Sequence, residues 1–153
     1  RLTPDEQYSH VSIFSLLAAP LLIGCPIEQL DDFTMGLLTN DEIIEVNQDP
    51  LGISARLVLE KNGVQVWKKP LSDGSFALGF FYTEEFGKTP QTYFHWENEK
   101  PILITVDLNS LGLKENYMLR DVWQQKNLGK IKNQISMNIP HHGVKFYKLS
   151  PIK

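Results

Sequence analysis

The sequence predicts a mainly β protein in which an antiparallel β-sandwich follows a shorter α-β-α segment. Three observations predict this. Residues 1–52 hold one short apolar run between helical patterns, and the remaining residues hold many short strand-like segments with turn signals between them. The charge balance also changes at the same place, from −8 over residues 1–52 to +5 over residues 53–153. We therefore predict two domains, 1–52 and 53–153, which meet at a turn containing Pro50 and Gly52.

The first predicted element is a helix over residues 4–18. Thr3 is a suitable N-cap, Pro4 suits the first helical position, and Glu6 completes a capping box. Apolar residues form a broad face on this helix, too broad for a helix that faces solvent, and Pro20 ends it.

The second element is a strand over residues 21–25, where the apolar run is continuous. Such a run is typical of a strand that is buried on both faces, as in parallel sheets, and Pro26 ends it. Two helical patterns follow, at residues 30–38 and 40–46. A unit with one strand has no partner for the backbone edges of that strand, so residues 1–52 are not expected to fold alone.

The remaining elements are strands of the sandwich. Period-two alternation of apolar residues is clear at residues 102–106 and 135–139, which gives each of these strands one solvated face. Residues 126–132 contain three lysines and are predicted to be a solvated loop. The predicted strands are 56–60, 64–69, 75–82, 92–96, 102–108, 116–122, 135–139 and 144–149.

Composition excludes several classes of protein. The net charge of −3 supplies no basic surface for nucleic acid, and no apolar run approaches the roughly 20 residues that cross a bilayer. Cys25 is the only cysteine, so an internal disulfide and a multi-thiolate zinc site are both excluded. We expect the side chains of His141 and His142 to point in opposite directions, and we predict no metal, no cofactor, no nucleic-acid partner and no membrane contact.

Several longer strings of residues identify a family. The string V-N-Q-D-P-L-G at residues 46–52 is the most specific of them, and A-A-P-L-L-I-G-C at residues 18–25 precedes it. Downstream lie V-W-K-K-P-L at 66–71, R-D-V-W at 120–123 and P-H-H-G-V at 140–144. Over nearly its whole length the chain resembles the C-terminal portion of family 27 glycoside hydrolases, the α-galactosidases and α-N-acetylgalactosaminidases.

The resemblance implies a layout. Residues 1–52 would be the last helix-strand-helix portion of a (β/α)8 TIM barrel, with residues 21–25 as its eighth strand. Residues 53–153 would be the antiparallel C-terminal β-domain. The orphan strand then has neighbours, because the first and seventh barrel strands would lie on either side of it.

The resemblance also implies an activity, the retaining hydrolysis of terminal α-galactosides. That chemistry needs two carboxylates roughly 5–5.5 Å apart. In the family these are aspartates in a K-Y-D and a D-P-D-M type motif, and this sequence contains neither, so both are expected upstream of Arg1. We therefore predict no catalytic residue here, a supporting role for the chain, and contact with an α-galactoside only through the parent enzyme. The alternative is a stand-alone, non-catalytic sandwich that binds carbohydrate or a protein partner.

Cys25 and Pro26 are the candidate substrate-binding residues, because active sites form at the C-terminal ends of barrel strands. Many family members have an aspartate at the place of Pro26, so this sequence departs from the pattern there. The competing interpretation is that Cys25 is a buried strand residue. If the chain exists alone, we expect residues 4–18 and 21–25 to expose apolar surface and unpaired edges, and either to drive self-association or to repack on the β-domain.

Two other groups of residues have structural and functional interpretations. Asp31 and Asp32 are adjacent, and a role at a helix N-terminus is favoured over acid/base chemistry because neighbouring helical residues do not converge on one atom. An aromatic group could form a sugar-stacking platform, but core packing is favoured. Its members are Phe80, Phe81, Tyr82, Tyr93, Phe94 and Trp96.

Overall fold

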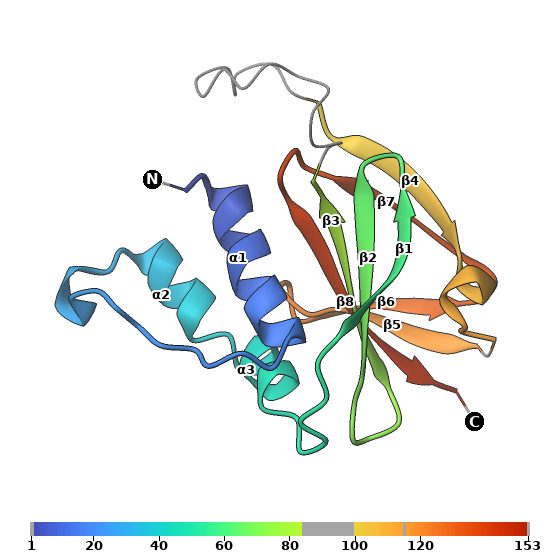
Figure 1. Ribbon diagram of the computed structural model, residues 1–153, viewed down its shortest axis with the longest axis horizontal. Coiled ribbons are helices and arrows are strands. Elements are labelled where there is room, and N and C mark those ends of the chain that lie inside the picture. Colours follow the sequence, from blue (N-terminus) through green and yellow to red (C-terminus); the bar gives the residue numbers. More distant parts are fainter. Residues whose placement is uncertain (1, 84–99, 115, 153) are drawn as a thin grey trace.

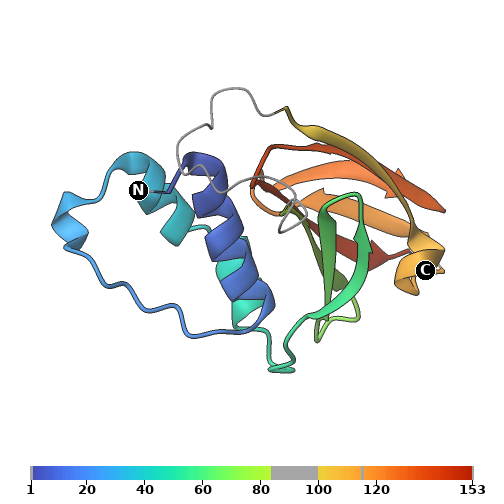
Figure 2. The same ribbon diagram turned by 45° about the horizontal axis from the view of Figure 1, so that its top comes forward.

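Two antiparallel sheets and a group of helices form three layers (Figure 1). The structure is a computed structural model, and it describes residues 2–83, 100–114 and 116–152. The larger sheet has six strands in the order β1-β2-β3-β8-β5-β6, and the smaller pairs β4 with β7. The helices cover the face of the larger sheet that is turned away from the smaller one (Figure 2).

The predicted start of the first helix is confirmed. Helix α1 is Pro4–Leu16. The Thr3 hydroxyl accepts a hydrogen bond from the Glu6 amide at 3.3 Å, and the Thr3 amide donates to Glu6 Oε2 at 2.8 Å, which is the capping box. The helix ends two residues earlier than predicted, and Ala18 lies beyond it in the left-handed region with φ 51°.

Four short helical elements complete the α-helical and 3-10 content of the described residues. Helix α2 is Asp32–Leu38 and helix α3 is Asp41–Asn47. The 3-10 helices are η1, Ile27–Gln29, and η2, Leu108–Leu111. Both views show α1 between α2 and the sandwich, with a long excursion of the chain from the end of α1 to the start of α2 (Figures 1 and 2).

The strands agree closely with the predicted ones, apart from β6. In the six-stranded sheet they are β1, Arg56–Lys61, β2, Val64–Pro70, β3, Phe76–Tyr82, β8, Val144–Pro151, β5, Tyr117–Asp121, and β6, Lys126–Ile131. In the two-stranded sheet they are β4, Ile102–Asp107, and β7, Gln134–Ile139. The predicted strand 92–96 lies outside the described residues.

The main hydrophobic core lies between the two sheets. The alternation predicted for β4 and β7 is confirmed, because Ile104 pairs with Met137 and Val106 with Ile135, and all four side chains are buried. On the outer face of the same pair, the hydroxyls of Thr105 and Ser136 lie 2.7 Å apart. The two-stranded sheet therefore has one buried face and one solvent-exposed face, as its sequence pattern predicted.

A second core lies between the six-stranded sheet and the helices. Leu16 from α1, with Ile43 and Val46 from α3, packs against Ala77, Phe81, Val122, Val144 and Phe146 from the sheet. Strand β3 is consequently buried on both faces. One hydrophobic cluster thus joins residues on both sides of Gly52, while the division into domains 1–52 and 53–153 stays a prediction.

The predicted buried strand over residues 21–25 is wrong for this chain. These residues form no strand and lie exposed, with Leu22 at 90% of its full accessible surface. The physical reason is that no other described strand lies beside them, and a lone segment has no neighbour to complete the hydrogen bonds of its backbone.

The predicted loop at residues 126–132 is also wrong, since most of it is strand β6. It pairs with β5 alone and forms one edge of the sheet. Lysines are common on such edges because they oppose pairing with another chain. Their presence here marks an edge strand rather than a loop.

Candidate functional site

Cys25 and Pro26 lie on the exposed excursion between α1 and α2, both with exposed side chains. The interpretation of Cys25 as a buried strand residue is therefore wrong here. Cys25 lines a cavity of about 530 Å³ between α1, residues 20–25, the end of α2 and α3, and Pro26 does not. Apart from Cys25, the only titratable side chain in this lining is His10. The cavity is thus apolar and holds no carboxylate for acid/base chemistry.

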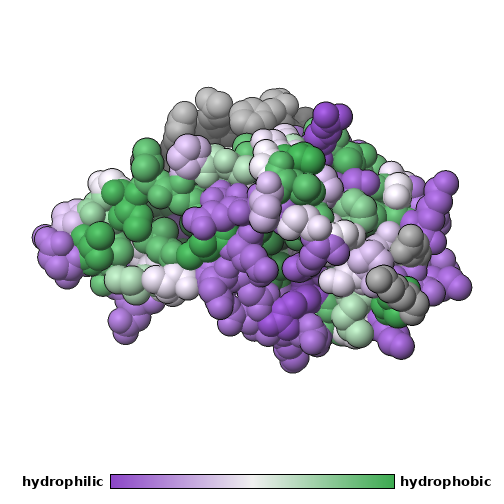
Figure 3. Space-filling view, turned by 90° about the horizontal axis from the view of Figure 1, so that it is seen from below, coloured by the Kyte–Doolittle hydropathy of each residue, from purple (hydrophilic) through white to green (hydrophobic). Residues whose placement is uncertain are grey.

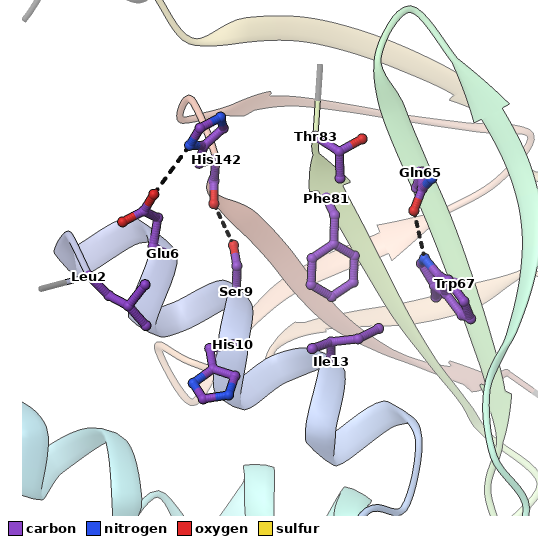
Figure 4. A pocket seen from close by; sticks show the side chains of 10 residues that line it. All are labelled: Leu2, Glu6, Ser9, His10, Ile13, Gln65, Trp67, Phe81, Thr83 and His142. Carbon is purple, nitrogen blue, oxygen red and sulfur yellow. Dashed lines mark hydrogen bonds and ion pairs between the residues drawn. The ribbon is translucent and has the colours of Figure 1, made fainter. Parts of the chain in front are cut away.

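A second cavity of about 530 Å³ lies between α1 and the six-stranded sheet, beside β2 and β3 (Figure 4). We call it the α1–sheet cavity. Helix α1 contributes Glu6, Ser9, His10 and Ile13, and Leu2, two residues before the helix, also lines it. The sheet side is formed by Gln65, Trp67, Phe81, Thr83 and His142.

Two ionisable side chains of this cavity, Glu6 and His142, are bonded to each other. Glu6 Oε1 lies 3.3 Å from Nδ1 of His142, and the Ser9 hydroxyl donates to the carbonyl of His142 at 2.6 Å (Figure 4). Burial raises the pKa of Glu6, but the Thr3 amide and His142 outweigh this, so the pKa of Glu6 lies below its ordinary value. Glu6 is therefore ionised near neutral pH, which suits a cap and an ion pair but not a general acid.

The aromatic wall of the cavity is also internally bonded. The Trp67 indole N–H donates to Gln65 Oε1 at 3.3 Å, and the Thr83 hydroxyl donates to the carbonyl of Gly63 at 3.3 Å. Phe81 is almost fully buried against the helices. The cavity presents a mostly apolar wall whose polar groups are largely occupied by protein partners.

A smaller cavity of about 160 Å³ contains more charge. Glu42 and Glu45 of α3 line it together with Arg120 and Lys148 of the sheet. The Arg120 Nε donates to both oxygens of Glu42, at 3.0 and 2.8 Å, and its Nη2 also bonds Glu42. This bidentate pair fixes α3 to β5 and occupies the Glu42 carboxylate.

The adjacent carboxylates Asp31 and Asp32 have the structural role that was favoured. Asp31 is the N-cap of α2, and its Oδ1 accepts from the Thr34 amide at 2.7 Å. Asp32 is the first residue of that helix. Negative charge at this end is stabilised by the helix dipole and by the free amides.

The two histidines do not point in opposite directions, so that prediction is wrong. Their rings stack with centroids 3.9 Å apart. They lie in a turn closed by a hydrogen bond from the Gly143 amide to the Pro140 carbonyl, with His142 at φ 53°, and the alternation of an extended strand does not apply there. Within the described parts of the chain, no group of three or more histidine, cysteine or acidic side chains could hold a metal.

The aromatic group is divided by the structure. Phe80 is buried between the sheets and Phe81 under the helices, which confirms core packing for these two. Tyr82 is half-buried at the margin of the first core. Tyr93, Phe94 and Trp96 lie outside the described residues.

Three serines on one face of α1 were not predicted from the sequence to be contact residues. The Ser9 hydroxyl bonds the His142 carbonyl, Ser12 accepts from the Trp123 indole at 2.9 Å, and Ser15 donates to the Ile43 carbonyl at 2.8 Å. Ser12 and Ser15 are fully buried. Their spacing of three residues was the signal, because it places them on one face of a helix.

No helix in the described residues is long and apolar enough to cross a membrane.

Comparison with known proteins gives consistent relatives. A model of the α-galactosidase C-terminal β-sandwich domain matches residues 61–149. An α-galactosidase of Cyamopsis tetragonoloba is 34% identical over 152 residues, which are 98% of this chain and 34% of the relative. A probable α-galactosidase of Dictyostelium discoideum is 35% identical over 156 residues, covering 98% of this chain and 37% of the relative. The chain thus spans about a third of the length of these curated relatives.

Solved structures show the same extent of similarity. A β-L-arabinopyranosidase of family GH27 from Geobacillus stearothermophilus matches with a TM-score of 0.82 and 30% identity, over 99% of this chain and 31% of that one. The α-galactosidase I of Mortierella vinacea matches with a TM-score of 0.82 over 98% of this chain and 36% of that one; at 22% identity this match shows the fold alone.

Proposed function

Because this chain belongs to the α-galactosidase family, as a C-terminal portion of a family 27 glycoside hydrolase, we propose that it supports a catalytic barrel that hydrolyses terminal α-galactosides. In this proposal residues 1–52 complete that barrel, and the sandwich holds them in place. The catalytic carboxylates belong to the part of the relatives that this chain does not match.

One observation carries the proposal, namely the concentration of exposed apolar side chains in the helical part. Figure 3 shows apolar residues gathered at the left of the molecule, over this part. Among the residues that the structure describes, eleven of the fourteen exposed large apolar ones lie between residues 2 and 53. They are Leu2, Phe14, Leu17, Leu21, Leu22, Ile23, Ile27, Phe33, Met35, Leu51 and Ile53. A surface of this kind is typical of an interface with another part of a protein.

The packing of α1 supports the same conclusion. Helix α1 buries Ser12, Ser15 and Leu16 against the sandwich and α3. Phe14 and the C-cap Leu17 are exposed nevertheless. An ordinary surface helix carries its apolar residues on the core side and polar residues on the other. Helix α1 is therefore built to have a partner on its second side as well.

Residues 21–25 are the segment on which such a partner would act most directly. Their apolar side chains suit a strand that is buried on both faces, and no strand of the described part of the chain lies beside them. Two parallel barrel strands would supply the missing backbone bonds and cover Leu22. The end of this strand would then bring Cys25 and Pro26 to the substrate side of the barrel.

The chemistry of the described cavities agrees with a supporting role. The Cys25 cavity has no carboxylate, and the α1–sheet cavity has only Glu6, which is bonded to His142. The smaller cavity has two, Glu42 and Glu45, but both lie on α3 and Glu42 is bonded to Arg120. Retaining glycosidases need two carboxylates facing one bond. None of these three cavities offers two carboxylates from facing elements.

A chimera tests the proposal. The matched third of the Cyamopsis tetragonoloba relative is replaced by this chain, and hydrolysis of 4-nitrophenyl α-galactoside is measured. We expect the chimera to be soluble and active. Leu22→Asp places a charge in the expected barrel interior, where an unpaired charge is very costly, and should abolish folding of the chimera. The same substitution should have little effect on the folding of the isolated chain, because Leu22 is exposed there.

Leu128→Asp is the matched control, since Leu128 is 46% exposed on the edge strand β6 and lies outside residues 1–52. We expect the L128D chimera to retain its folding and activity. An L22D chimera as stable and as active as the L128D chimera would contradict the proposal, because Leu22 would then be exposed in the longer protein as well.

A further inference from the structure

The C-terminal end of α1 is bonded by groups from three separate segments of the chain. The last carbonyls of a helix have no partner within it and need one elsewhere. Here the Phe14 carbonyl accepts from Asn47 Nδ2 at 3.2 Å, and the Leu16 carbonyl accepts from the Ala55 amide at 2.8 Å. The carbonyl of Leu17, the C-cap, accepts from the Ser54 hydroxyl at 2.8 Å.

Lys69 of β2 is the central member of this group. Its Nζ donates to the carbonyl of Ser15 at 3.4 Å and also to the carbonyl of Val46. The first lies in the last turn of α1 and the second in the last turn of α3. One side chain from the sandwich therefore binds the C-terminal ends of two helices, where a positive charge is favoured by both helix dipoles.

The environment of Lys69 makes this contact a strong constraint on position. Lys69 has no accessible surface, although a lysine is almost never fully buried without partners. Its neighbour in sequence, Lys68, is on the other face of β2 and donates to the Leu111 carbonyl in η2. A buried cation that loses its carbonyl partners would be left desolvated and without those hydrogen-bond acceptors, so α1 and α3 cannot move away from β2 without a large cost.

We propose that Lys69 is a positioning residue through which the β-sandwich fixes α1 and α3, independently of any barrel partner. Residues 20–28, which lie between α1 and α2, do not share this attachment and are exposed. The sandwich thus holds α1, which precedes the Cys25 segment, and α3, which follows α2, while that segment itself is left to be ordered by its partner. This inference goes beyond the proposed hydrolase function and does not depend on the substrate.

Hydrogen exchange of the isolated chain, followed by mass spectrometry of peptides, tests the proposal. In the wild-type chain we expect amides of α1 and α3 to be protected and those of residues 20–28 to exchange at nearly unprotected rates. In Lys69→Met, which keeps length and apolar contact but removes the donors, exchange in α1 and α3 should accelerate at least about tenfold, while β4 and β7 remain unchanged.

Lys68→Met is the matched control, because it removes a neighbouring lysine with a carbonyl partner on the other face of the strand. It should accelerate exchange in η2 and leave α1 and α3 unchanged. The double variant Asn47→Ala/Ser54→Ala keeps Lys69 and removes two other donors, so it tests the same attachment if Lys69→Met does not fold. It should loosen the end of α1 more than the sandwich.

Three results would overturn the proposal. The first is exchange of α1 in the wild-type chain as fast as that of residues 20–28. The second is an equal acceleration in β4, β7 and the helices of K69M, which would mean that Lys69 contributes only to global stability. The third is an effect of K68M on the helices as large as that of K69M.

Discussion

The packing of α1 on the sandwich is tested most sharply at Gly79. This residue of β3 lies opposite Trp67 in β2. A Cβ atom added there would lie 2.5 Å from Leu16 Cδ1 and 2.5 Å from Phe81 Cε2, well inside contact distance. The Phe81 ring borders the α1–sheet cavity and has space to shift, whereas Leu16 is 0% exposed and has none. Gly79→Ala should therefore push α1 away from the sheet, at a cost of about 1–3 kcal/mol of unfolding free energy.

Leu16→Ala supplies the second half of a double-mutant cycle. Removing this fully buried side chain should destabilise the chain by about 2–5 kcal/mol. In the double variant the new methyl group at position 79 enters the space that Leu16 has left. The two effects should then fall short of additivity by about 1–2 kcal/mol, within the range measured for residues in contact.

Urea unfolding followed by tryptophan fluorescence measures all four proteins of this cycle. Trp67 and Trp123 both pack against the second core, between the six-stranded sheet and the helices, so their fluorescence emission reports on this region. Costs that add within about 0.5 kcal/mol would refute the reasoning, because Leu16 would then not lie over Gly79.

Two further predictions concern charge and assembly. Burial raises the pKa of Asp73, but hydrogen bonds from Ser75 and the Lys148 ammonium at 2.9 Å outweigh it and lower the pKa to about 2. The folded pKa is thus below the unfolded value of 3.8, so this stabilisation is complete above about pH 4 and is lost as the pH falls towards 2. Because the Asp73 side chain is 53% exposed, we expect the ion pair to contribute only about 1 kcal/mol or less to the free energy of unfolding. In Asp73→Asn the free energy of unfolding, measured with urea, should therefore depend less steeply on pH in this range. A slope unchanged in D73N would contradict this assignment. The isolated chain should also self-associate through its exposed apolar residues, so light scattering should show a concentration-dependent mass that Leu22→Asp lowers and Leu128→Asp does not. A monomer at all concentrations would argue against it.

The elements that could be predicted from the sequence are those whose signals are local. The capping box at Thr3 and Glu6 needs only the spacing of three residues, and Asp31 acts as an N-cap for the same reason. Strands β4 and β7 alternate because one face of each is buried, so their pattern survives in the sequence. Turn signals such as Asn62-Gly63 separated the other strands, since Asn62 and Gly63 both have positive φ.

The elements that could not be predicted depend on neighbours. The apolar run at residues 21–25 resembles a buried strand. A strand forms only when another strand completes the hydrogen bonds of its backbone, and no described strand lies beside these residues. Strand β6 could not be predicted for the opposite reason. Its polar residues are typical of a loop, and it is a strand because it pairs with β5.

In the candidate site, too, residues whose role depends on partners distant in sequence could not be predicted. Lys69 lies in a strand between Lys68 and Pro70, and nothing local distinguishes it from a solvated lysine. Its importance comes from Ser15 and Val46, which are distant in sequence and meet it only because α1 and α3 end at the same point of the sheet. The serines of α1 were visible as a spacing, but their partners Trp123 and His142 were not.

The central claim is that this chain supplies support and not the catalytic carboxylates. The most direct measurement is the rate at which the purified 153-residue chain hydrolyses 4-nitrophenyl α-galactoside. We predict no rate above that of the buffer alone, because the cavities described above hold no two carboxylates on facing elements. The two carboxylates of the smaller cavity, Glu42 and Glu45, both lie on α3, and Glu42 is bonded to Arg120. Turnover that follows the chain through purification and disappears in Glu6→Gln, the carboxylate of the α1–sheet cavity, would contradict the claim.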